Sequence, residues 1–592
     1  MTSSLKPFFE PAGVAVIGAS ANPRKLSFGI MRNLVSSTYA GGIYPVNPGA
    51  EKILDKPGFS DISAVPDPLE LAVIALPAPV IAETLEACGR RGVKAVIVIS
   101  GGFKEVGEGG QALEARCLEI IHRYGMRMIG PNCVGLMNLH NGLNTTFIHG
   151  VPDAGGIGFM AQSGAVLGGV VDQVLGKKIG FSHFISMGNE ADVTETDLME
   201  YLGEDPRTRV IATYVEQIKD GRRFLETARR VSRVKPIVLL KGGRSSAGAR
   251  AVSSHTGSLA GSYAAYQAAF RQAGVVEVES IGALFETALA FDFQPLPAGR
   301  RAVIVTNAGG PAALASDALS ANGLVLDELG EETRAVLRAA LNPAAQVSNP
   351  VDILGGAEPP DYALCTSTLM KDEQVDIVLP LLVPQALVSP AGVAQAVADA
   401  SAGREKTVLA CVMGDISVDE ARLVLHEHRI PMYAQPESAG AVLKAMLDYK
   451  EWLSSPVVPP PALAGIERKA GREVLKAAGG KASLGEVETR PLLAAYGIPL
   501  VEGGFAANSA EAAAVAARIG YPVVMKIVSP QLLHKSDAGG IKLNLADEAA
   551  LRQAYSAMMT EINAARPDAL LEGVMVERMA PKGQEVIIGM RR

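Results

Sequence analysis

The stretch GVAVIGAS, residues 13–20, decides the fold class of this chain. Its apolar run predicts a strand buried on both faces, and the glycine that follows opens a tight turn. Three further apolar stretches come next, with helical patterns between them: GGIYPVNPG (41–49), LELAVIALPAP (69–79) and KAVIVISGGF (94–103). This alternation predicts a doubly wound, Rossmann-like parallel sheet, which binds ligands at the carboxyl ends of its strands.

The strand–turn–helix pattern restarts twice along the chain. It begins again with GIGFMAQSGAV at residue 156 and with RAVIVTNAGGPAAL at residue 301, so two more doubly wound, flavodoxin-like domains are expected. After a Pro- and Ala-rich linker, stretches such as YPVVMKIVSP (521–530) predict an antiparallel α+β region instead. The expected organisation is four domains and a linker: 1–145, 150–294, 300–453, linker 454–484, and 485–592.

Composition excludes several classes of protein. The formal net charge of −7 argues against a general nucleic-acid or membrane-surface partner. The five cysteines lack metal-ligand spacing and suit a reducing compartment. The chain shows neither the apolar core of a signal peptide nor an apolar run of transmembrane length. We therefore expect a soluble cytoplasmic protein.

The first glycine-rich turn, VIGASANPRKLSFG, predicts a phosphate-bearing ligand less strongly than a strict GxGxxG would. A nicotinamide site usually has an acid at the end of the second strand, but that strand ends in Pro45, Val46, Asn47 and Pro48. Coenzyme A needs no such carboxylate and therefore fits better.

A lone histidine, His255, lies among small polar residues in VSSHTGSLAG (252–261). It is either an ordinary surface-loop histidine or a nucleophile whose small neighbours leave room for a phosphoryl group. Glu216, at the end of the buried strand in TYVEQIKDG, is either a solvated loop acid or the carboxylate that orients an imidazole N–H.

Two turns repeat one arrangement in consecutive domains. Ser163 and Gly164 follow one predicted strand, Gly309 and Gly310 follow another, and each pair leads into an Ala- and Gly-rich helix. They are either simple tight turns or two helix N-termini that converge on one anion.

In the last segment, Lys526 lies inside the apolar strand PVVMKIV and needs an anionic partner, either ATP phosphate or an internal salt bridge. HKSDAGGIK (534–542) has the composition of a loop over phosphates. Glu577 and Glu585 are candidates for contacts with the nucleotide and its Mg²⁺.

These motifs, taken in order, resemble the NDP-forming acyl-CoA synthetases, relatives of succinyl-CoA synthetase. The resemblance runs through essentially the whole chain and rests on GAS (18–20), YPVNP (44–48), GPNCVGL (130–136), QSGA, SHTGSLAG, TNAGGPA and SNPVDILG. It implies a CoA-binding domain, two ligase domains and the first part of an ATP-grasp domain. The implied reaction joins a small carboxylic acid to CoA at the expense of ATP, through a phosphohistidine and an acyl phosphate.

The resemblance also implies a role for each candidate residue. His255 is the expected phosphohistidine, Glu216 its carboxylate partner and His534 a second phosphate carrier. Ser163, Gly164, Gly309 and Gly310 are expected to hold phosphate, Lys526 and Glu577 to bind ATP, and Glu585 to bind Mg²⁺. The expected CoA contacts are Gly18, Ser20, Asn47, Pro77 and Asn132.

The identity of the acid stays open, and the family suggests a homodimer. Related ATP-grasp modules continue beyond the point that corresponds to residue 592, so we expect this sequence to be a fragment. Two alternatives to the ligase remain: a non-catalytic CoA-binding protein with an incomplete ATP-grasp domain, and a nicotinamide oxidoreductase.

Overall fold

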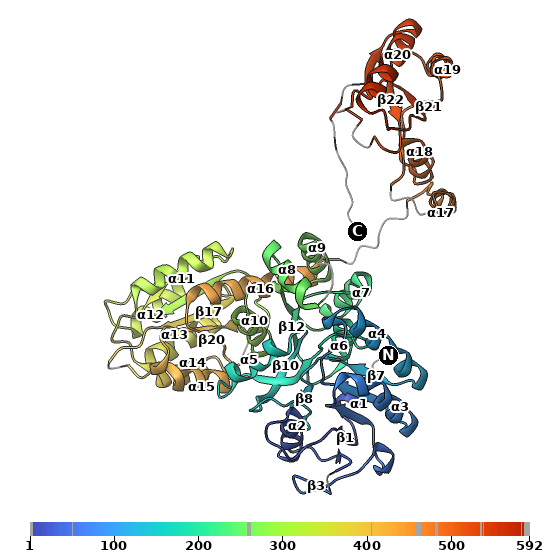
Figure 1. Cartoon of the computed structure of the whole chain (residues 1–592). Helices are drawn as coiled ribbons and strands as arrows, with labels where there is room; N and C mark the ends of the chain where they lie inside the picture. Colours follow the sequence, from blue (N-terminus) through green and yellow to red (C-terminus); the bar gives the residue numbers. More distant parts are fainter. Residues whose placement is uncertain are drawn as a thin grey trace. The chain divides into compact units, whose positions relative to one another are not determined.

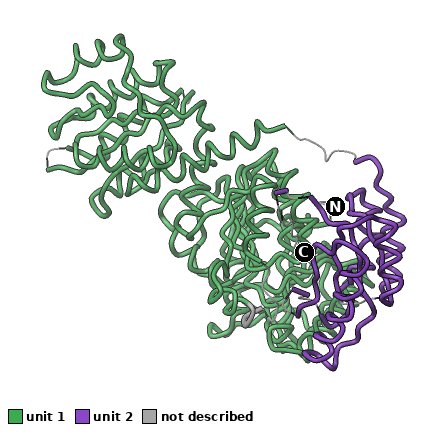
Figure 2. Tube along the Cα trace, turned by 90° about the horizontal axis from the view of Figure 1, so that it is seen from above, with its two compact units in different colours: residues 1–456 green, residues 457–592 purple. Residues whose placement is uncertain are grey.

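The computed structural model (Figure 1) describes most of the chain. The described residues are 4–49, 51–256, 262–386, 388–403, 405–456, 463–479, 483–532, 535–536, 538–581, 583–584 and 586, without the side chains of 253–256. The chain divides into two compact units, residues 1–456 and residues 457–592 (Figure 2). Each unit is described separately below.

The first sheet of unit 1 is fully parallel, with the order β2-β1-β5-β6-β7. Every residue of β1 is buried, because helices cover both faces of the sheet. The chain reverses its winding between β1 and β5, and this switch point is where doubly wound sheets bind ligands. The strands are β1 (Gly13–Ile17), β2 (Gly42–Val46), β5 (Leu71–Ile74), β6 (Ala95–Val98) and β7 (Arg127–Ile129), and the helices are α2 (Leu26–Val35), α3 (Ile81–Arg91) and α4 (Glu108–Tyr124).

The second sheet has the order β14-β13-β12-β10-β11-β8-β9, in which five parallel strands have the flavodoxin order. The hairpin β8–β9 extends it by antiparallel pairing with β11. These strands lie within the predicted first domain, 1–145, but complete the second sheet. The strands are β8 (Leu136–Asn138), β9 (Leu143–Asn144), β10 (Asp153–Ala161), β11 (Gly180–Ser186), β12 (Val210–Val215), β13 (Ile237–Lys241) and β14 (Val276–Val278).

The helices of the second sheet are α5 (Gly164–Val174), α6 (Glu195–Glu204), α7 (Gly221–Ser232), α8 (Ser246–Thr256), α9 (Tyr263–Ala273) and α10 (Ile281–Phe293). One hydrophobic cluster contains Val14 and Val16 from the first sheet together with Ile211 from the second sheet and Leu198 from its helix α6. The first two sheets therefore share a core, which fixes their carboxyl ends relative to each other.

The third sheet of unit 1 repeats the flavodoxin order, β16-β15-β17-β19-β20, with β18 paired to β17. Its strands are β15 (Ala302–Thr306), β16 (Val351–Asp352), β17 (Ile377–Leu382), β18 (Thr407–Val408), β19 (Ala410–Val412) and β20 (Met432–Tyr433). Its helices are α11 (Gly309–Ala321), α12 (Glu331–Ala340), α13 (Pro359–Lys371), α14 (Pro390–Ala400), α15 (Asp419–Glu427) and α16 (Pro436–Ser454).

Unit 2 contains a four-stranded sheet with the order β21-β24-β22-β23, in which all pairs are antiparallel. Its strands are β21 (Gly503–Ala506), β22 (Val523–Val528), β23 (Ile541–Leu545) and β24 (Gly573–Arg578). Its helices are α17 (Arg468–Ala477), α18 (Glu486–Ala495), α19 (Ser509–Ile519) and α20 (Glu548–Ala565). The predicted fold class, three doubly wound domains followed by an α+β region, is confirmed. Among the described residues, no helix is both long and apolar enough to span a membrane.

Candidate functional site

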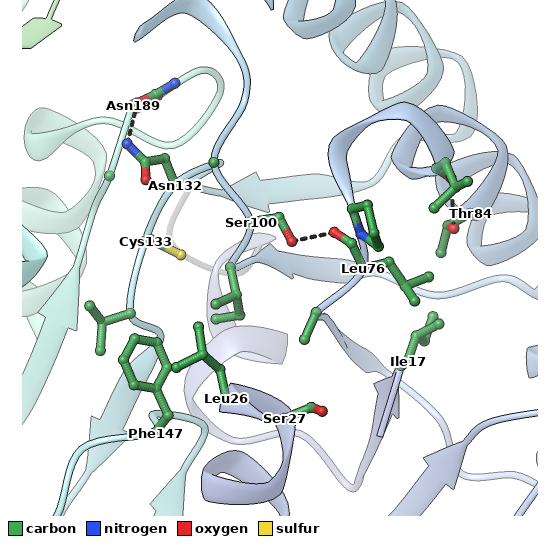
Figure 3. A pocket seen from close by; sticks show the side chains of 18 of the residues that line it. Ile17, Leu26, Ser27, Leu76, Thr84, Ser100, Asn132, Cys133, Phe147 and Asn189 are labelled. Atoms are coloured by element: carbon green, nitrogen blue, oxygen red, sulfur yellow. Dashed lines mark hydrogen bonds between the residues drawn. The ribbon is translucent and has the colours of Figure 1, made fainter. Parts of the chain in front are cut away.

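A cavity of about 1160 Å³ lies in unit 1 where the carboxyl ends of the first two sheets face each other (Figure 3). Four of the five expected CoA contacts line it: Gly18, Asn47, Pro77 and Asn132. Gly18 has a φ of +85°, and a Cβ there would come within 2.7 Å of the Ala75 carbonyl oxygen, so this turn requires glycine. The fifth expected contact, Ser20, is 8% exposed and does not line the cavity.

The polar groups of the first sheet are held in place by short local bonds. The Asn47 side chain donates to the Ala19 carbonyl at 2.7 Å, which joins the ends of β1 and β2. Asn132 has a φ of +60°, and its backbone N–H donates to the Ser100 carbonyl at 2.9 Å. These hydrogen bonds fix the backbone at the carboxyl ends of the strands that line the cavity.

The turn after β10 brings a helix N-terminus into this cavity. Ser163 caps α5 by accepting a hydrogen bond from the Val166 N–H at 3.4 Å, and both Ser163 and Gly164 line the cavity. A Cβ on Gly164 would lie 2.5 Å from a methyl carbon of Val134. The free N–H groups of the first turn suit a phosphoryl or carboxylate oxygen.

The second predicted turn does not reach the cavity. Gly309 and Gly310 begin α11 on the third sheet, where both are exposed. Among the described residues that line the cavity, neither glycine is present. The convergence of the two helix N-termini on one anion stays a prediction.

Glu216 lies directly after β12, lines the same cavity and is 9% exposed. Its carboxylate is hydrogen-bonded to Tyr214, whose pKa rises to about 12 because the phenol is buried and lies near this carboxylate. The Lys241 ammonium donates to the Glu216 carbonyl at 2.7 Å, and burial lowers the pKa of Lys241 to about 8. Glu216 is therefore a buried carboxylate at the cavity wall, and its role as the partner of an imidazole stays a prediction.

The backbone of His255 belongs to α8, which corrects the expectation of a loop at 252–256. Ser245 starts this helix by accepting a hydrogen bond from the Gly248 N–H at 3.1 Å, and the Ala-rich sequence that follows favours helix. The His255 side chain and residues 257–261 lie outside the described residues. Helix α8 contacts the short helix η4 (Lys104–Val106), whose Lys104 lines the cavity.

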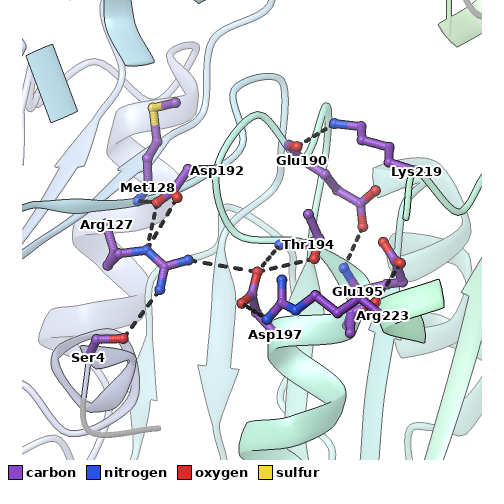
Figure 4. A network of polar contacts seen from close by, with 11 residues as sticks. Ser4, Arg127, Met128, Glu190, Asp192, Thr194, Glu195, Asp197, Lys219 and Arg223 are labelled. Carbon is purple, nitrogen blue, oxygen red and sulfur yellow. Dashed lines mark hydrogen bonds and ion pairs between the residues drawn. The ribbon is translucent and has the colours of Figure 1, made fainter. Parts of the chain in front are cut away.

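A loop that the sequence did not single out, residues 187–194 after β11, crosses from the second sheet to the first. The Asn189 N–H donates to the Pro131 carbonyl at 2.8 Å, and the Ala191 N–H donates to the Gly130 carbonyl at 3.0 Å. Beside this loop, Arg127 of β7 pairs with Asp192 at 2.9 Å (Figure 4). Asn189 and Glu190 from this loop line the cavity.

Two lysines also reach the cavity from opposite domains. Lys104 and Lys219 both donate to the Asn189 carbonyl, at 2.6 and 3.1 Å. Burial and the neighbouring Lys219 lower the pKa of Lys104. In the sequence, four acids lie close together shortly after an apolar strand: Glu190, Asp192, Glu195 and Asp197. This concentration of acids is the sequence feature that could have indicated the polar groups of the loop and of the start of α6.

In unit 2, the two predicted ATP contacts form one ion-paired cluster. The Lys526 ammonium lies 2.6 Å from Glu577 and 2.9 Å from Glu486, and Glu577 also pairs with Arg490. Glu486 pairs with Lys535 at 2.5 Å. Burial lowers the pKa of Lys526, but the hydrogen bonds to Glu577 and Glu486 outweigh it and leave the pKa above its usual value. The internal salt bridge, one of the two alternatives for Lys526, is therefore present.

Two expected residues of unit 2, His534 and Glu585, lie outside the described residues. Within the described part of the chain, no group of three His, Cys, Asp or Glu side chains could hold a metal ion. Both carboxylates of the Lys526 cluster are already bound to cations. The described residues therefore do not form a Mg²⁺ site, and the Mg²⁺ expectation stays a prediction.

Four family models match successive parts of the chain: a CoA binding domain (residues 13–138), a succinyl-CoA ligase like flavodoxin domain (154–291), a Ligase-CoA domain (302–455) and an ATP-grasp domain (475–592). Acetate–CoA ligase [ADP-forming] I of Archaeoglobus fulgidus is 39% identical over 99% of this chain and 84% of its own. The 4-hydroxybutyrate–CoA ligase [ADP-forming] of Nitrosopumilus maritimus is 35% identical over 100% of this chain and 85% of its own.

Among solved structures, the dinucleotide-forming acetyl-coenzyme A synthetase 1 of Candidatus Korarchaeum cryptofilum, in complex with phosphate and ADP, is similar to this chain. It is 37% identical, has a TM-score of 0.73, and the match covers 77% of this chain and 98% of that chain.

Proposed function

Because the chain belongs to the family of ADP-forming acyl-CoA ligases, with CoA and ATP as its nucleotide substrates, we propose that it makes the acyl-CoA thioester through a phosphohistidine at His255. The observation that carries this proposal is the shared cavity. Four of the five expected CoA contacts, the α5 N-terminus and Glu216 line it. The groups that are proposed to hold CoA, the phosphoryl group and the histidine therefore face one cavity, in which the acyl carbonyl can react.

The reaction balances in three steps. ATP bound by unit 2 transfers its γ-phosphoryl group to the His255 imidazole and leaves as ADP. A carboxylate oxygen of the acid attacks this phosphorus, the P–N bond breaks, and an acyl phosphate forms. The CoA sulfur then attacks the carbonyl carbon, the C–O bond to phosphate breaks, and the thiol proton leaves with phosphate.

Seven described residues of the cavity contribute to this sequence of steps. Ser163 and Gly164 aim the first N–H groups of α5 at the phosphoryl oxygens, where charge accumulates. Glu216 accepts the imidazole N–H and favours the ring tautomer whose other nitrogen is nucleophilic. Gly18, Asn47, Pro77 and Asn132 form the surface along which CoA lies.

The acid substrate is proposed to be a monocarboxylic acid with an uncharged, apolar substituent. Val134 touches Gly164 at the α5 N-terminus, and it lines the cavity together with Leu26 and Phe147 (Figure 3). Leu26 lies three residues before Gly29 on α2, and a Cβ at Gly29 would be 3.0 Å from the Phe147 Cβ, so both residues are on the α2 face that meets Phe147. An apolar wall beside the reacting carbonyl disfavours a second carboxylate.

The test is phosphoryl labelling of the full chain with γ-³²P-ATP and Mg²⁺, followed by a chase with CoA and a panel of acids. We expect an acid-labile, alkali-stable label that is lost in His255→Ala and kept in His149→Ala. Monocarboxylic acids with apolar substituents should discharge it to acyl-CoA, whereas succinate should not. Labelling that persists unchanged in His255→Ala contradicts the phosphohistidine, and preference for a dicarboxylic acid contradicts the proposed acid class.

A further inference from the structure

Glu190 is a buried acid that the reaction above does not use, although its side chain belongs to the cavity wall. It is 3% exposed, and its φ of +51° is a left-handed conformation that a residue with a side chain rarely adopts. The Lys219 ammonium donates to its carbonyl at 2.5 Å and helps to hold this backbone (Figure 4). Strain of this kind persists only where the surrounding structure enforces it, and residues that carry it cluster at functional sites.

The Glu190 carboxyl is joined to Glu216 through a single side chain, that of Gln162. Gln162 Nε2 donates to Glu190 Oε2 at 2.7 Å and to the Gln217 carbonyl at 2.7 Å. Gln162 Oε1 accepts from the backbone N–H groups of Glu216 at 2.5 Å and of Gln217 at 3.0 Å. One amide therefore ties the end of β10, the loop after β11 and the loop after β12.

Glu190 supports the observed direction of this amide. A glutamine amide has a donating and an accepting end, and the accepting end must face the N–H groups of Glu216 and Gln217. The Gln217 carbonyl and the two N–H groups set this orientation, and Glu190 Oε2 supports it by accepting from the donating end at 2.7 Å. The Glu195 N–H donates to the other Glu190 oxygen at 3.0 Å and fixes the carboxyl in turn.

The charge of Glu190 is set by the groups around it. Burial and the nearby Glu195 raise the pKa of Glu190 well above its usual range, and burial also raises that of Glu195. The charged groups that face Glu190 are Glu195 from α6, Lys219 after β12, and Lys104 from η4. Among the described residues, Glu195 Oε2 has no hydrogen-bond partner, which shows how little solvation a charge would have here.

Resting on the proposed function, we propose that Glu190 is a positioning residue that acts in its protonated form. It holds the Gln162 amide, and through it the Glu216 backbone, in the geometry that the phosphohistidine requires. Its neutrality also keeps negative charge away from the part of the cavity where phosphoryl oxygens bind. Loss of its proton at alkaline pH would add a charge there and weaken phosphate binding by repulsion.

The test uses the nucleotide-free direction of the reaction, so that it depends on unit 1 chemistry alone. The full chain is incubated with an acyl-CoA that the wild type accepts and with ³²P-phosphate, which converts His255 to phosphohistidine and releases acid and CoA. The label and its dependence on phosphate concentration are measured from pH 6 to pH 9. The variants are Glu190→Gln, which keeps an acceptor but cannot ionise, and Glu190→Met, which has a similar shape without an acceptor. Glu200→Gln on α6 is the matched control.

We expect Glu190→Met to label about tenfold more slowly with unchanged CoA affinity, because it loses two buried hydrogen bonds, those from Gln162 Nε2 and from the Glu195 N–H. Glu190→Gln should label at nearly the wild-type rate and should lose the alkaline weakening of phosphate binding. Wild-type behaviour of Glu190→Met, or an alkaline weakening that persists in Glu190→Gln, overturns the inference. If Glu190→Met does not fold, the pH profile of Glu190→Gln decides alone. Absence of label in the wild type and in Glu200→Gln would instead contradict the proposed function.

Discussion

Each unit buries acidic side chains next to its expected ligand contacts, but the two units neutralise these acids in opposite ways. In unit 1, Glu190 and Glu195 are 3% and 1% exposed, and their carboxyl oxygens accept hydrogen bonds from backbone N–H, amide and hydroxyl groups. In unit 2, Glu577 is 4% exposed and contacts two cations, Lys526 and Arg490. Uncharged donors hold the first cluster, and basic side chains hold the second.

This difference indicates what each cluster responds to. A cluster neutralised by protons changes its charge with pH, whereas a cluster of ion pairs changes when another anion competes for its cations. Lys526 is bound to Glu486 and Glu577, so a nucleotide phosphate that reaches it must share or replace these carboxylates. The unit 1 cavity, in contrast, presents its α5 N-terminus to open space.

The largest expected effect comes from removing the central cation of unit 2. Lys526→Met leaves the nearly buried Glu577 with one cation instead of two, and breaking a buried pair in this way costs about 3 kcal/mol. Hydrogen exchange of the β22 and β24 amides in the full chain measures the loss.

The matched control for this prediction is Lys542→Met on the neighbouring strand β23. Lys542 pairs at 2.7 Å with Glu561, whose side chain is 55% exposed, so its removal should cost less than about 1 kcal/mol. Equal losses in the two variants would mean that unit 2 does not depend on its buried ion pairs, and the contrast between the clusters would disappear.

The fold was predictable because its dominant signal is local. Runs such as Val14–Ile17 and Ile237–Leu240 are fully or almost fully buried strands, and continuous apolar runs are typical of parallel sheets covered on both faces. Long-range pairing was not predictable: β8 and β9 join the second sheet because of contacts with β11, which no local pattern encodes. The sequence predicted a loop at His255 because serine and glycine favour loops, whereas the alanines earlier in α8 favour the helix that the structure has there.

The candidate site was predictable where a turn sequence marks it. Gly18, Asn47, Asn132, Gly164 and Glu216 each follow a strand, and the structure brings them to one cavity. The roles of Gln162 and Glu190 could not be derived in this way, because a hydrogen bond across 28 residues leaves no periodic signal. Likewise, Glu486 lies 40 residues before Lys526, and only the folded sheet brings the two together.

A smaller effect tests the packing of the α5 N-terminus against Val134 in the cavity of unit 1. Gly164→Ala places a methyl group 2.5 Å from a Val134 methyl carbon, and overpacking of this kind costs about 1 to 2 kcal/mol. We expect a lower unfolding temperature and slower phosphohistidine labelling, both restored in large part by the double variant Gly164→Ala, Val134→Ala.

The matched control for this substitution is Gly169→Ala on the same helix. A Cβ there would meet no atom within 4 Å, so the greater helix propensity of alanine should leave stability unchanged or raise it by up to about 1 kcal/mol. If Gly164→Ala is as well tolerated as Gly169→Ala, the α5 N-terminus is not packed against Val134 as the structure has it.

The smallest effect is the most direct contrast between the two acidic clusters, because they should respond to pH with opposite signs. The pKa of Glu190 is raised by burial and by Glu195, so the contribution of Glu190 to stability is complete below the unfolded pKa of about 4.3 and is lost as pH rises through the folded value.

In unit 2, burial raises the pKa of Glu486, but the hydrogen bonds of Glu486 to Lys535 and Lys526 outweigh burial and lower this pKa overall. Its contribution is therefore present above about 4.3 and lost as pH falls through the folded value. Hydrogen exchange of β10 and β12 for unit 1, and of β22 for unit 2, followed as opening free energies from pH 2.5 to pH 8, separates the two. Glu190→Gln should flatten the slope in unit 1 and leave unit 2 unchanged; a slope in unit 1 that is the same with and without Glu190 would show that its proton does not balance the cluster.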